Sequence, residues 1–264
     1  MVSVKKLKTE AREIRKDVLD MIVSARAMHI ASSYSIVELL VYLYEDFLRV
    51  DFSFQADRDK FILSKGWGIS TLYAVLARKG FFKKELLDTY CKDGSPFMGA
   101  ATRTIPGVEA TTCSMGHGLP IGVGMALANR LQQNPGRVVV LLSDGECDEG
   151  SVWEAILQAG HYKLDNLIAI VDYNKFQSFG RVEDILDLEP FPQKWEAFRW
   201  SVQSIDGHNF NEIRDAFKKL RKGKPNVIIA HTIKGKGLSV MEGKNEWHYQ
   251  TPGEAEIAIA EKEL

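Results

Sequence analysis

The sequence has few cysteines and no long apolar run. Three cysteines, Cys91, Cys113 and Cys147, stand among 264 residues, an odd count without the spacing of metal ligands. This usage argues against a disulfide framework and favours a reducing compartment. No run is apolar and long enough to cross a bilayer, and residues 1–13 are basic and lack the apolar core of a signal peptide. We therefore expect a cytoplasmic protein without a membrane partner.

Neither sign of charge is in excess. The 34 basic and 35 acidic residues give a formal net charge of -1 and are interspersed along the chain, which disfavours nucleic acid or an anionic membrane surface as a partner. Neither an internal repeat nor a low-complexity linker divides the sequence. A hydrophobic content of 45% can fill a large core. Residues 1–264 are therefore predicted to form a single α/β domain.

Short apolar runs alternate with segments of helical periodicity. The short runs are rich in β-branched residues, as strands buried on both faces are. Strands are predicted at residues 61–63, 138–142, 167–171, 201–205 and 227–230. Helices are predicted at residues 5–24, 35–48, 69–79, 152–159, 213–220 and 254–263, with another starting at residue 118. Residues 181–196 are predicted to be an acidic, proline-containing connection. This order predicts a mostly parallel central sheet with helices on both faces.

Polar side chains follow two of the predicted strands directly. Ser143-Asp144-Gly145 ends the strand at 138–142, and Asp172-Tyr173-Asn174 ends the strand at 167–171. Ligands of open α/β sheets bind at the carboxyl edge, where parallel strands end together. A carboxylate and an amide oxygen suit a hard divalent cation that shares its ligands with a phosphate. Asp144 and Asn174 are therefore expected to lie together at one site.

This arrangement resembles the signature of thiamine diphosphate enzymes, which is Gly-Asp-Gly, a spacer and then Asn. It stands here as Ser143-Asp144-Gly145 followed by Asn174. Further matches narrow the resemblance to the amino-terminal, diphosphate-binding domain of the transketolase family, and they are Glu149-Gly150, Trp153-Glu154, Ala159-Gly160, Leu164 and Gly180. The resemblance covers nearly the whole chain. It implies the thiamine diphosphate-binding fold.

The resemblance also implies a cofactor and a metal site. The side chains of Asp144 and Asn174 and the carbonyl of Phe176 are expected to bind Mg²⁺, or Ca²⁺ in its place, with the cofactor diphosphate completing the shell. Gly145 lets the backbone approach that phosphate closely. Met115 and Gly116 correspond to the family's contacts with the cofactor rings, and Trp67 stands near the diphosphate and the substrate.

Two histidines and one glutamate are the catalytic candidates that the resemblance implies. His29 and His248 correspond to family histidines that face the reaction centre, although a lone histidine is more often structural. Glu149 and Glu154 match family acids that are linked by hydrogen bonds to the activating glutamate of the other half of the enzyme. The alternative for Glu149, and equally for Glu154, is a solvated helix start, where negative charge is favourable.

The chain departs from the family at three positions. Trp67 stands where the family has a histidine, and Ala100 replaces a histidine that is associated with the donor's terminal hydroxyl group. Cys113 replaces a common glycine, so close approach of the backbone there is less assured. Trp67 carries a bulky ring with a hydrogen-bond donor only. These changes favour a donor other than the usual phosphoketoses.

The resemblance implies a subunit of a split transketolase that moves a two-carbon ketol unit between sugar substrates. The glutamate that activates the cofactor lies on the family's pyrimidine-binding domain, which is expected, like the C-terminal domain, to be absent from residues 1–264. A separate subunit carrying that domain is the expected partner, in a heterotetramer. Two alternatives are a diverged ketol or acyl transferase of specialised sugar or natural-product metabolism, and a non-catalytic regulatory subunit.

Overall fold

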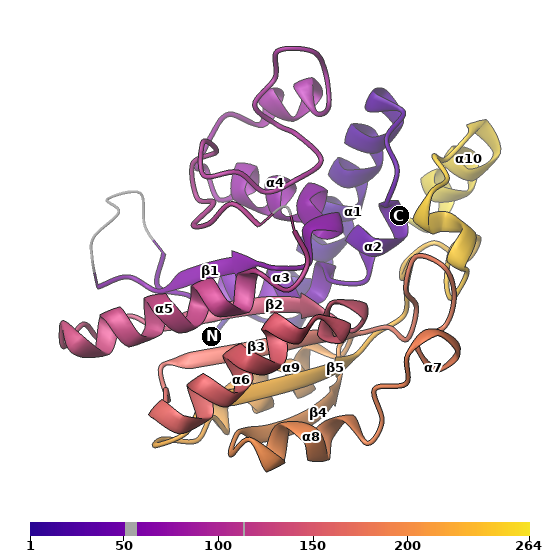
Figure 1. The fold of residues 1–264 in the computed structure, drawn as a ribbon. Coiled ribbons are helices and arrows are strands. Elements are labelled where there is room, and N and C mark those ends of the chain that lie inside the picture. Colours follow the sequence, from indigo (N-terminus) through magenta and orange to yellow (C-terminus); the bar gives the residue numbers. More distant parts are fainter. Residues whose placement is uncertain (51–56, 113) are drawn as a thin grey trace.

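Five parallel strands form the centre of the molecule, in the order β1-β2-β3-β5-β4 (Figure 1). The computed structural model describes residues 1–50, 57–112 and 114–264. The strands are β1 (Lys60–Leu63), β2 (Val138–Ser143), β3 (Leu167–Tyr173), β4 (Ser201–Asp206) and β5 (Asn226–His231). All five predicted strands are confirmed, with ends that differ by one or two residues.

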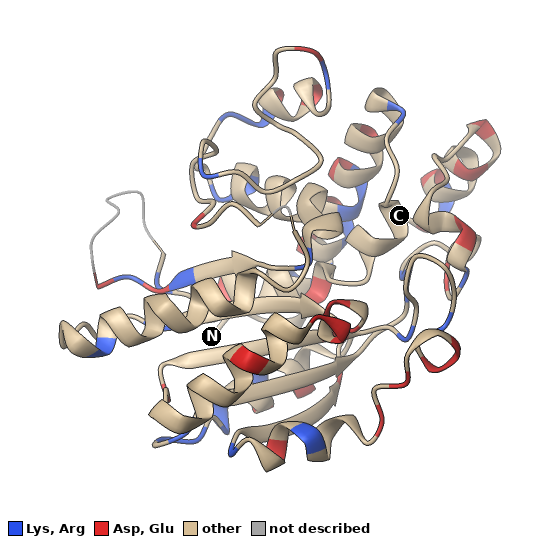
Figure 2. Cartoon of the chain, in the orientation of Figure 1, with Lys and Arg blue, Asp and Glu red and all other residues tan. Residues whose placement is uncertain are grey.

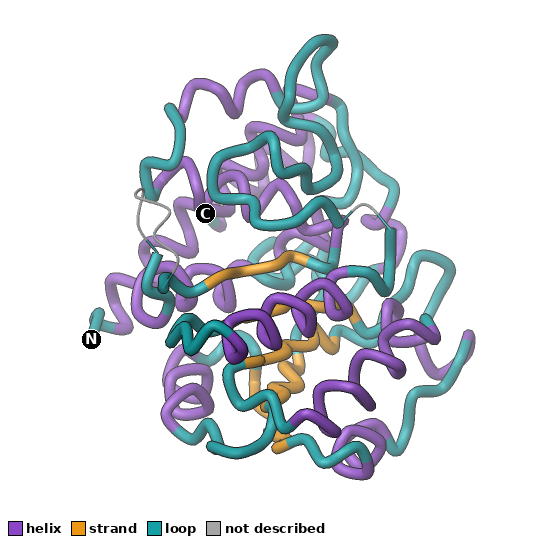
Figure 3. Tube along the Cα trace, turned by 60° about the vertical axis from the view of Figure 1, so that its left-hand side comes forward, coloured by secondary structure: helices purple, strands orange, loops and turns teal. Residues whose placement is uncertain are grey.

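Helices cover both faces of this sheet, as predicted (Figures 1 and 3). The helices on one face are α1 (Val4–Ala25), α2 (Ile30–Tyr34), α3 (Val37–Tyr42), α4 (Ile69–Arg78) and α9 (Phe210–Lys218). Those on the other face are α5 (Gly118–Leu131), α6 (Gly150–Tyr162) and α8 (Phe191–Ala197). The short α7 (Val182–Ile185) and the C-terminal α10 (Glu254–Glu263) complete the set.

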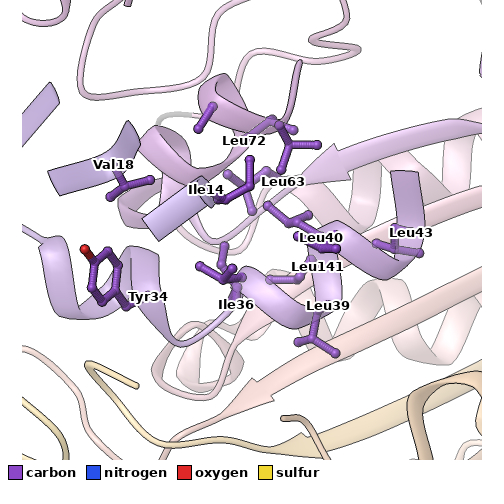
Figure 4. Close-up of a cluster of buried hydrophobic side chains, with 14 of the residues drawn as sticks. Ile14, Val18, Tyr34, Ile36, Leu39, Leu40, Leu43, Leu63, Leu72 and Leu141 are labelled. Carbon is purple, nitrogen blue, oxygen red and sulfur yellow. The ribbon is translucent and has the colours of Figure 1, made fainter. Parts of the chain in front are cut away.

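The alternation of side chains along each strand divides the core into two clusters. Val139 and Leu141 of β2 pack with α1, α3 and α4, whereas Val138, Val140 and Leu142 pack with α5 and α6. The first cluster is shown in Figure 4, where side chains of α1, α3 and α4 meet Leu63 and Leu141 of the sheet. Burial on both faces explains why the strands read as continuous apolar runs.

Two predicted segments differ from the structure. The helix expected at 35–48 begins two residues later, as α3, and ends in a π-helical turn, Leu43–Phe47; a break at Ser35 and Ile36 separates it from α2. The break turns the Ser35 hydroxyl group toward Asp172 of β3, to which it donates a hydrogen bond of 2.8 Å. The expected connection at 181–196 contains α7 and the start of α8, because Phe191 and Trp195 are fully buried.

Acidic and basic residues are interleaved along the helices and loops of the fold (Figure 2). Among the described residues, no helix combines the length and the apolar character needed to cross a membrane. A long, mostly irregular stretch folds beside α4 and β1 (Figures 1 and 3). In its described parts, residues 79–112 and 114–117, the only helix is the short 3-10 helix Lys84–Thr89. Cys113 and the predicted departure there lie outside the described residues.

Candidate functional site

The carboxyl ends of β2 and β3 meet at one cavity. The two strands are parallel neighbours with Ser143 paired to Asp172, so Asp144 and Asn174 follow at the same edge of the sheet. The cavity holds about 490 Å³ of empty space, part of it open to solvent, and it is lined by Ser32, Lys65, Trp67, Met115, Ser143, Asp144, Gly145, Asn174, Phe176, Gln177, Ser178 and His248. The predicted juxtaposition of Asp144 and Asn174 is confirmed.

Asp144 is a buried carboxylate whose hydrogen-bond partners among the described residues are backbone amides. Its Oδ1 accepts a hydrogen bond from the Gly145 amide at 2.8 Å, and its Oδ2 accepts one from the Lys175 amide at 2.6 Å. Burial, and then the nearby charge of Asp172, raise the pKa of Asp144 to about 7. Each carboxylate oxygen keeps a free lone pair. A cation at this point would therefore stabilise a charge that the protein leaves uncompensated.

Asn174 holds its amide in one orientation beside Asp144. Its Nδ2 donates to Asp172 Oδ2 at 2.9 Å, and its Oδ1 accepts from the Phe176 amide at 2.9 Å. Only 7% of Asn174 is exposed. The amide oxygen is thus the atom of this side chain that is available to the cavity.

The oxygen ligands fit a divalent cation that arrives with a phosphate. No cluster of three or more His, Cys, Asp and Glu side chains suited to a metal occurs in the described ranges. Mg²⁺ commonly takes one or two protein carboxylates or amides and completes its shell with phosphate oxygens and water. Gly145 lies close to Gln177, because a Cβ on Gly145 would lie 2.8 Å from Gln177 Cγ. A residue with a side chain at position 145 would therefore clash with Gln177, at the place where the diphosphate is expected.

Two half-exposed apolar side chains line the same cavity. Met115 is 48% exposed and Trp67 is 46% exposed, although both belong to the cavity wall. A thioether and an indole give an apolar surface on which an aromatic ring can pack. For Met115 this position agrees with the predicted contact with the cofactor rings, whereas Trp67 was predicted to lie near the diphosphate and the substrate.

Two histidines lie next to Trp67. The His29 ring stacks on Trp67 and meets His248 edge-on, with the His29 and His248 centroids 4.7 Å apart. The His29 amide also donates to the His248 carbonyl oxygen at 3.2 Å. Burial, with further contributions from Lys234 and Lys65, lowers the pKa of His29 to about 4 and that of His248 to about 3. Both rings are thus neutral at pH 7.

The Nδ1 atoms of both histidines are buried and have no hydrogen-bond partner among the described residues. Buried polar atoms in proteins are nearly always paired. Two unpaired ring nitrogens side by side therefore point to a bound polar group, and His248 is itself part of the cavity wall.

Gly116 and Glu149 lie behind the cavity wall. Gly116 has φ +76°, and a Cβ on it would lie 2.7 Å from the Cβ of Glu149. Its amide donates to Glu146 Oε1 at 2.9 Å. Glu149 is half-buried at the start of α6. Neither residue is part of the cavity wall, and the roles predicted for them are not tested by this geometry.

The remaining sequence candidates lie on the protein surface or its periphery. Glu154 is exposed on α6. Ala100 is half-buried outside the cavity wall, and its carbonyl oxygen accepts a hydrogen bond from the Tyr73 hydroxyl at 3.2 Å. The structure thus groups Asp144, Asn174, Phe176 and the aromatic and histidine residues, and leaves Ala100 and Glu154 apart.

Sequence reasoning missed four buried charged residues around the site, which are Lys65, Glu146, Asp172 and Lys234. Glu146 accepts hydrogen bonds from the Ser64 hydroxyl and from the amides of Gly116 and Ser143. Lys234 Nζ donates to the Gln177 carbonyl oxygen at 3.1 Å and to Asn245 Oδ1 at 2.7 Å. Their positions in the sequence, next to predicted strand ends and turns, could have indicated that these charged residues lie near the site.

The comparisons with known proteins agree with this geometry. Residues 7–264 match the family described as "Transketolase, thiamine diphosphate binding domain". The chain is 38% identical to an apulose-4-phosphate transketolase subunit of Phocaeicola vulgatus, with 100% of this chain and 95% of that protein covered. It is 43% identical to the 6-deoxy-6-sulfo-D-fructose transketolase subunit SqwG of Clostridium sp. strain MSTE9, with 97% of each covered.

Solved structures of longer transketolases share the fold. The transketolase of Leishmania mexicana superposes with a TM-score of 0.90 at 28% identity. That alignment covers 99% of this chain but 41% of the other. The chain therefore spans about two fifths of the length of the solved transketolase and nearly the full length of the subunit relatives.

Proposed function

This chain belongs to the transketolase family, and from that premise we propose that it is the metal- and diphosphate-binding subunit of a two-subunit transketolase. The reaction is transfer of a two-carbon ketol unit between sugar phosphates, with thiamine diphosphate and Mg²⁺ or Ca²⁺. The observation that carries the proposal is the convergence of Asp144 and Asn174 in one cavity at the ends of β2 and β3.

The chain's own residues would hold the metal and place the cofactor. When bound, thiamine diphosphate supplies the carbanion equivalent that carries the two-carbon unit. Asp144, Asn174 and the Phe176 carbonyl hold the cation, and Gly145 admits the diphosphate. Met115 and Trp67 give the apolar wall for the rings, with Gly116 supporting the turn that carries Met115.

His29 and His248 are the proposed proton-handling residues. Both are neutral at pH 7 because burial lowers the pKa of each ring, and a neutral imidazole can either accept or donate a proton. Their unpaired Nδ1 atoms can hold the hydroxyl and carbonyl groups of a sugar substrate. General acid-base catalysis by such a group typically contributes about 10²–10⁴-fold in rate.

The second subunit is part of the proposal. The subunit relatives, which this chain matches over 95% and 97% of their length, are each named as one subunit of a transketolase. We propose that residues 1–264 form a single domain and that a separate polypeptide carries the pyrimidine-binding and C-terminal domains. Two copies of each chain would form a heterotetramer. Glu149, at the start of α6, is proposed to hydrogen-bond the activating glutamate of that partner.

One observation favours an unusual donor. Trp67 occupies the cavity wall in place of the family's histidine and stacks on His29. An indole fills space and donates one hydrogen bond at most, so it reshapes the pocket at the donor's two-carbon end. A diverged ketol or acyl transferase of specialised sugar metabolism is therefore the second candidate. A non-catalytic regulatory subunit fits less well, because Asp144, Asn174 and both histidines are present and grouped.

The test is reconstitution. The chain is purified alone and together with a subunit that carries the pyrimidine-binding domain, each with thiamine diphosphate and Mg²⁺. Ketol transfer from a sugar phosphate by the pair, with metal-dependent cofactor binding, is the expected result. Absence of cofactor binding by the pair would contradict the proposal. Binding without transfer from a sugar phosphate but with transfer from another donor would favour the second candidate, and binding without transfer from any donor would favour the regulatory role.

A further inference from the structure

Asp172 is fully buried in β3 with four side-chain donors around it. Its Oδ2 accepts hydrogen bonds from Ser35 Oγ at 2.8 Å, from Asn174 Nδ2 at 2.9 Å and from Lys65 Nζ. Its Oδ1 accepts one from Thr232 Oγ1. The donors come from four separate segments, so this carboxylate joins the ends of α2, β1, β3 and β5.

Asp172 leaves Asn174 only one amide orientation. An ionised carboxylate has no donor, so it can bond only to the NH₂ end of the amide. The oxygen end then accepts from the Phe176 amide, as observed, and its second lone pair remains for a ligand in the cavity that Asn174 lines. If the amide turned over, two acceptors would face each other in a buried site, and such a contact is costly.

Lys65 balances the charge of Asp172 and is itself part of the cavity wall. The three N–H groups of Lys65 are all used, by the Ser32 carbonyl oxygen at 2.7 Å, by Ser35 Oγ at 2.8 Å and by Asp172. Both side chains are at most 5% exposed. The pair adds no net charge to the cavity, and Asp172 has no need of a cation.

We propose that Asp172, with Lys65 as its counter-ion, is a positioning residue that holds the Asn174 amide oxygen toward the metal and does not itself bind the metal. The inference rests on the proposed function, in which Asn174 is a ligand of Mg²⁺. Partners of metal ligands act in this way in other proteins, where their loss typically costs about 10–100-fold in metal affinity.

Two double variants of similar size test the proposal, and only one of them keeps an acceptor oxygen at position 172. Asp172→Leu with Lys65→Met removes the ion pair and the acceptor, whereas Asp172→Asn with Lys65→Met removes the ion pair but keeps a carbonyl oxygen for Asn174. Neither leaves an unpaired buried charge. Calorimetry on the reconstituted complex at saturating thiamine diphosphate gives the Mg²⁺ affinity, and thermal unfolding without metal reports on the fold.

The Leu variant is expected to lose about 10–100-fold in Mg²⁺ affinity, with the Asn variant within about threefold of the wild type. Equal affinities of the two variants would overturn the proposal. Thr232→Val is the control, because it removes a hydrogen bond to Asp172 but leaves Asn174 Nδ2 its acceptor.

A single substitution provides a second test, in case the Leu variant does not fold. Asn174→Asp supplies a charged oxygen that is a better metal ligand in itself, but it cannot donate to Asp172. The proposal expects weaker Mg²⁺ binding by about tenfold or more; equal or tighter binding would overturn it. Failure of the proposed function looks different, because the wild-type complex itself would then show no metal-dependent cofactor binding.

Discussion

The imidazole ring of His29 stacks on the indole ring of Trp67, with centroids 4.2 Å apart and an interplanar angle of 28°. The contact joins the turn before α2 to the 3-10 helix Gly66–Gly68. His29 has φ 71° there, a left-handed conformation that a non-glycine residue adopts only when its surroundings hold it. The departure from the family at position 67 therefore acts directly on a proposed proton-handling residue.

The first prediction concerns the donor. Standard phosphoketoses are expected to be poor donors, because a site that lacks its hydrogen-bond partner no longer favours a hydroxylated substrate. A panel of xylulose 5-phosphate, fructose 6-phosphate, hydroxypyruvate and pyruvate, compared by kcat/KM in the reconstituted enzyme, measures this. Trp67→His should raise kcat/KM for xylulose 5-phosphate, while Trp67→Phe, which keeps an aromatic ring, should not. Efficient use of xylulose 5-phosphate by the wild type would contradict the prediction.

The second prediction concerns the metal ligand. Asp144→Ala is expected to abolish metal-dependent binding of thiamine diphosphate, because it removes the buried carboxylate of the proposed site. Calorimetry with Mg²⁺ and the cofactor measures the change. Asp184→Ala, which removes an exposed carboxylate of α7, is the matched control. Unchanged cofactor affinity of Asp144→Ala would remove Asp144 from the site.

The third prediction is the pH dependence of metal binding. The pKa of Asp144 in the metal-free protein is raised to about 7, so the group is protonated below that pH and must lose its proton to bind a cation. The Mg²⁺ affinity of the cofactor-saturated complex should therefore fall by up to about tenfold per pH unit below 7. Isothermal titrations at pH 6 and pH 8 measure this. In Asp144→Asn the fall of Mg²⁺ affinity with pH that is due to this group should vanish. An equal pH dependence in Asp144→Asn and the wild type would show that another group is responsible.

The fourth prediction is the effect of His248 on acid stability. The folded-state pKa of His248 is about 3, while an unfolded histidine titrates near about 6.5. The unfolded state therefore binds more protons between these values, and the free energy of unfolding falls as the pH falls below about 6.5. Denaturant unfolding at pH 7.5 and pH 5.0 should show a smaller loss for His248→Asn than for the wild type. His161→Asn, at an exposed position of α6, is the control, and an equal loss in His248→Asn and the wild type would be the contrary result.

The fifth prediction is that the isolated chain does not turn over. The proposed site holds the metal and the diphosphate, but the activating glutamate is expected on the partner. Steady-state assays of the chain alone should show no ketol transfer, and light scattering should give the mass of a heterotetramer when the partner is added. Robust turnover by the homogeneous chain would show that the site is complete without it.

The sequence by itself determined the strands of the sheet and the placement of Asp144 and Asn174 at one edge of it. Apolar runs such as Val138–Leu142 are buried on both faces in the structure, because only a strand between two helical layers excludes water from every side chain. Asp144 and Asn174 could be placed together because parallel neighbouring strands end at one edge. Both inferences need only local patterns and the direction of the chain.

Only the tertiary structure decided which charges are buried and what they face. Lys65 and Asp172 are 107 residues apart, and Ser35 and Asp172 are 137 residues apart, so no local pattern pairs them. The same network holds Ser35 in the break before α3, whereas periodicity alone placed Ser35 at the start of that helix. A buried charge is stable only where donors from several segments converge on it, and that convergence exists only once the sheet and the helices have packed together.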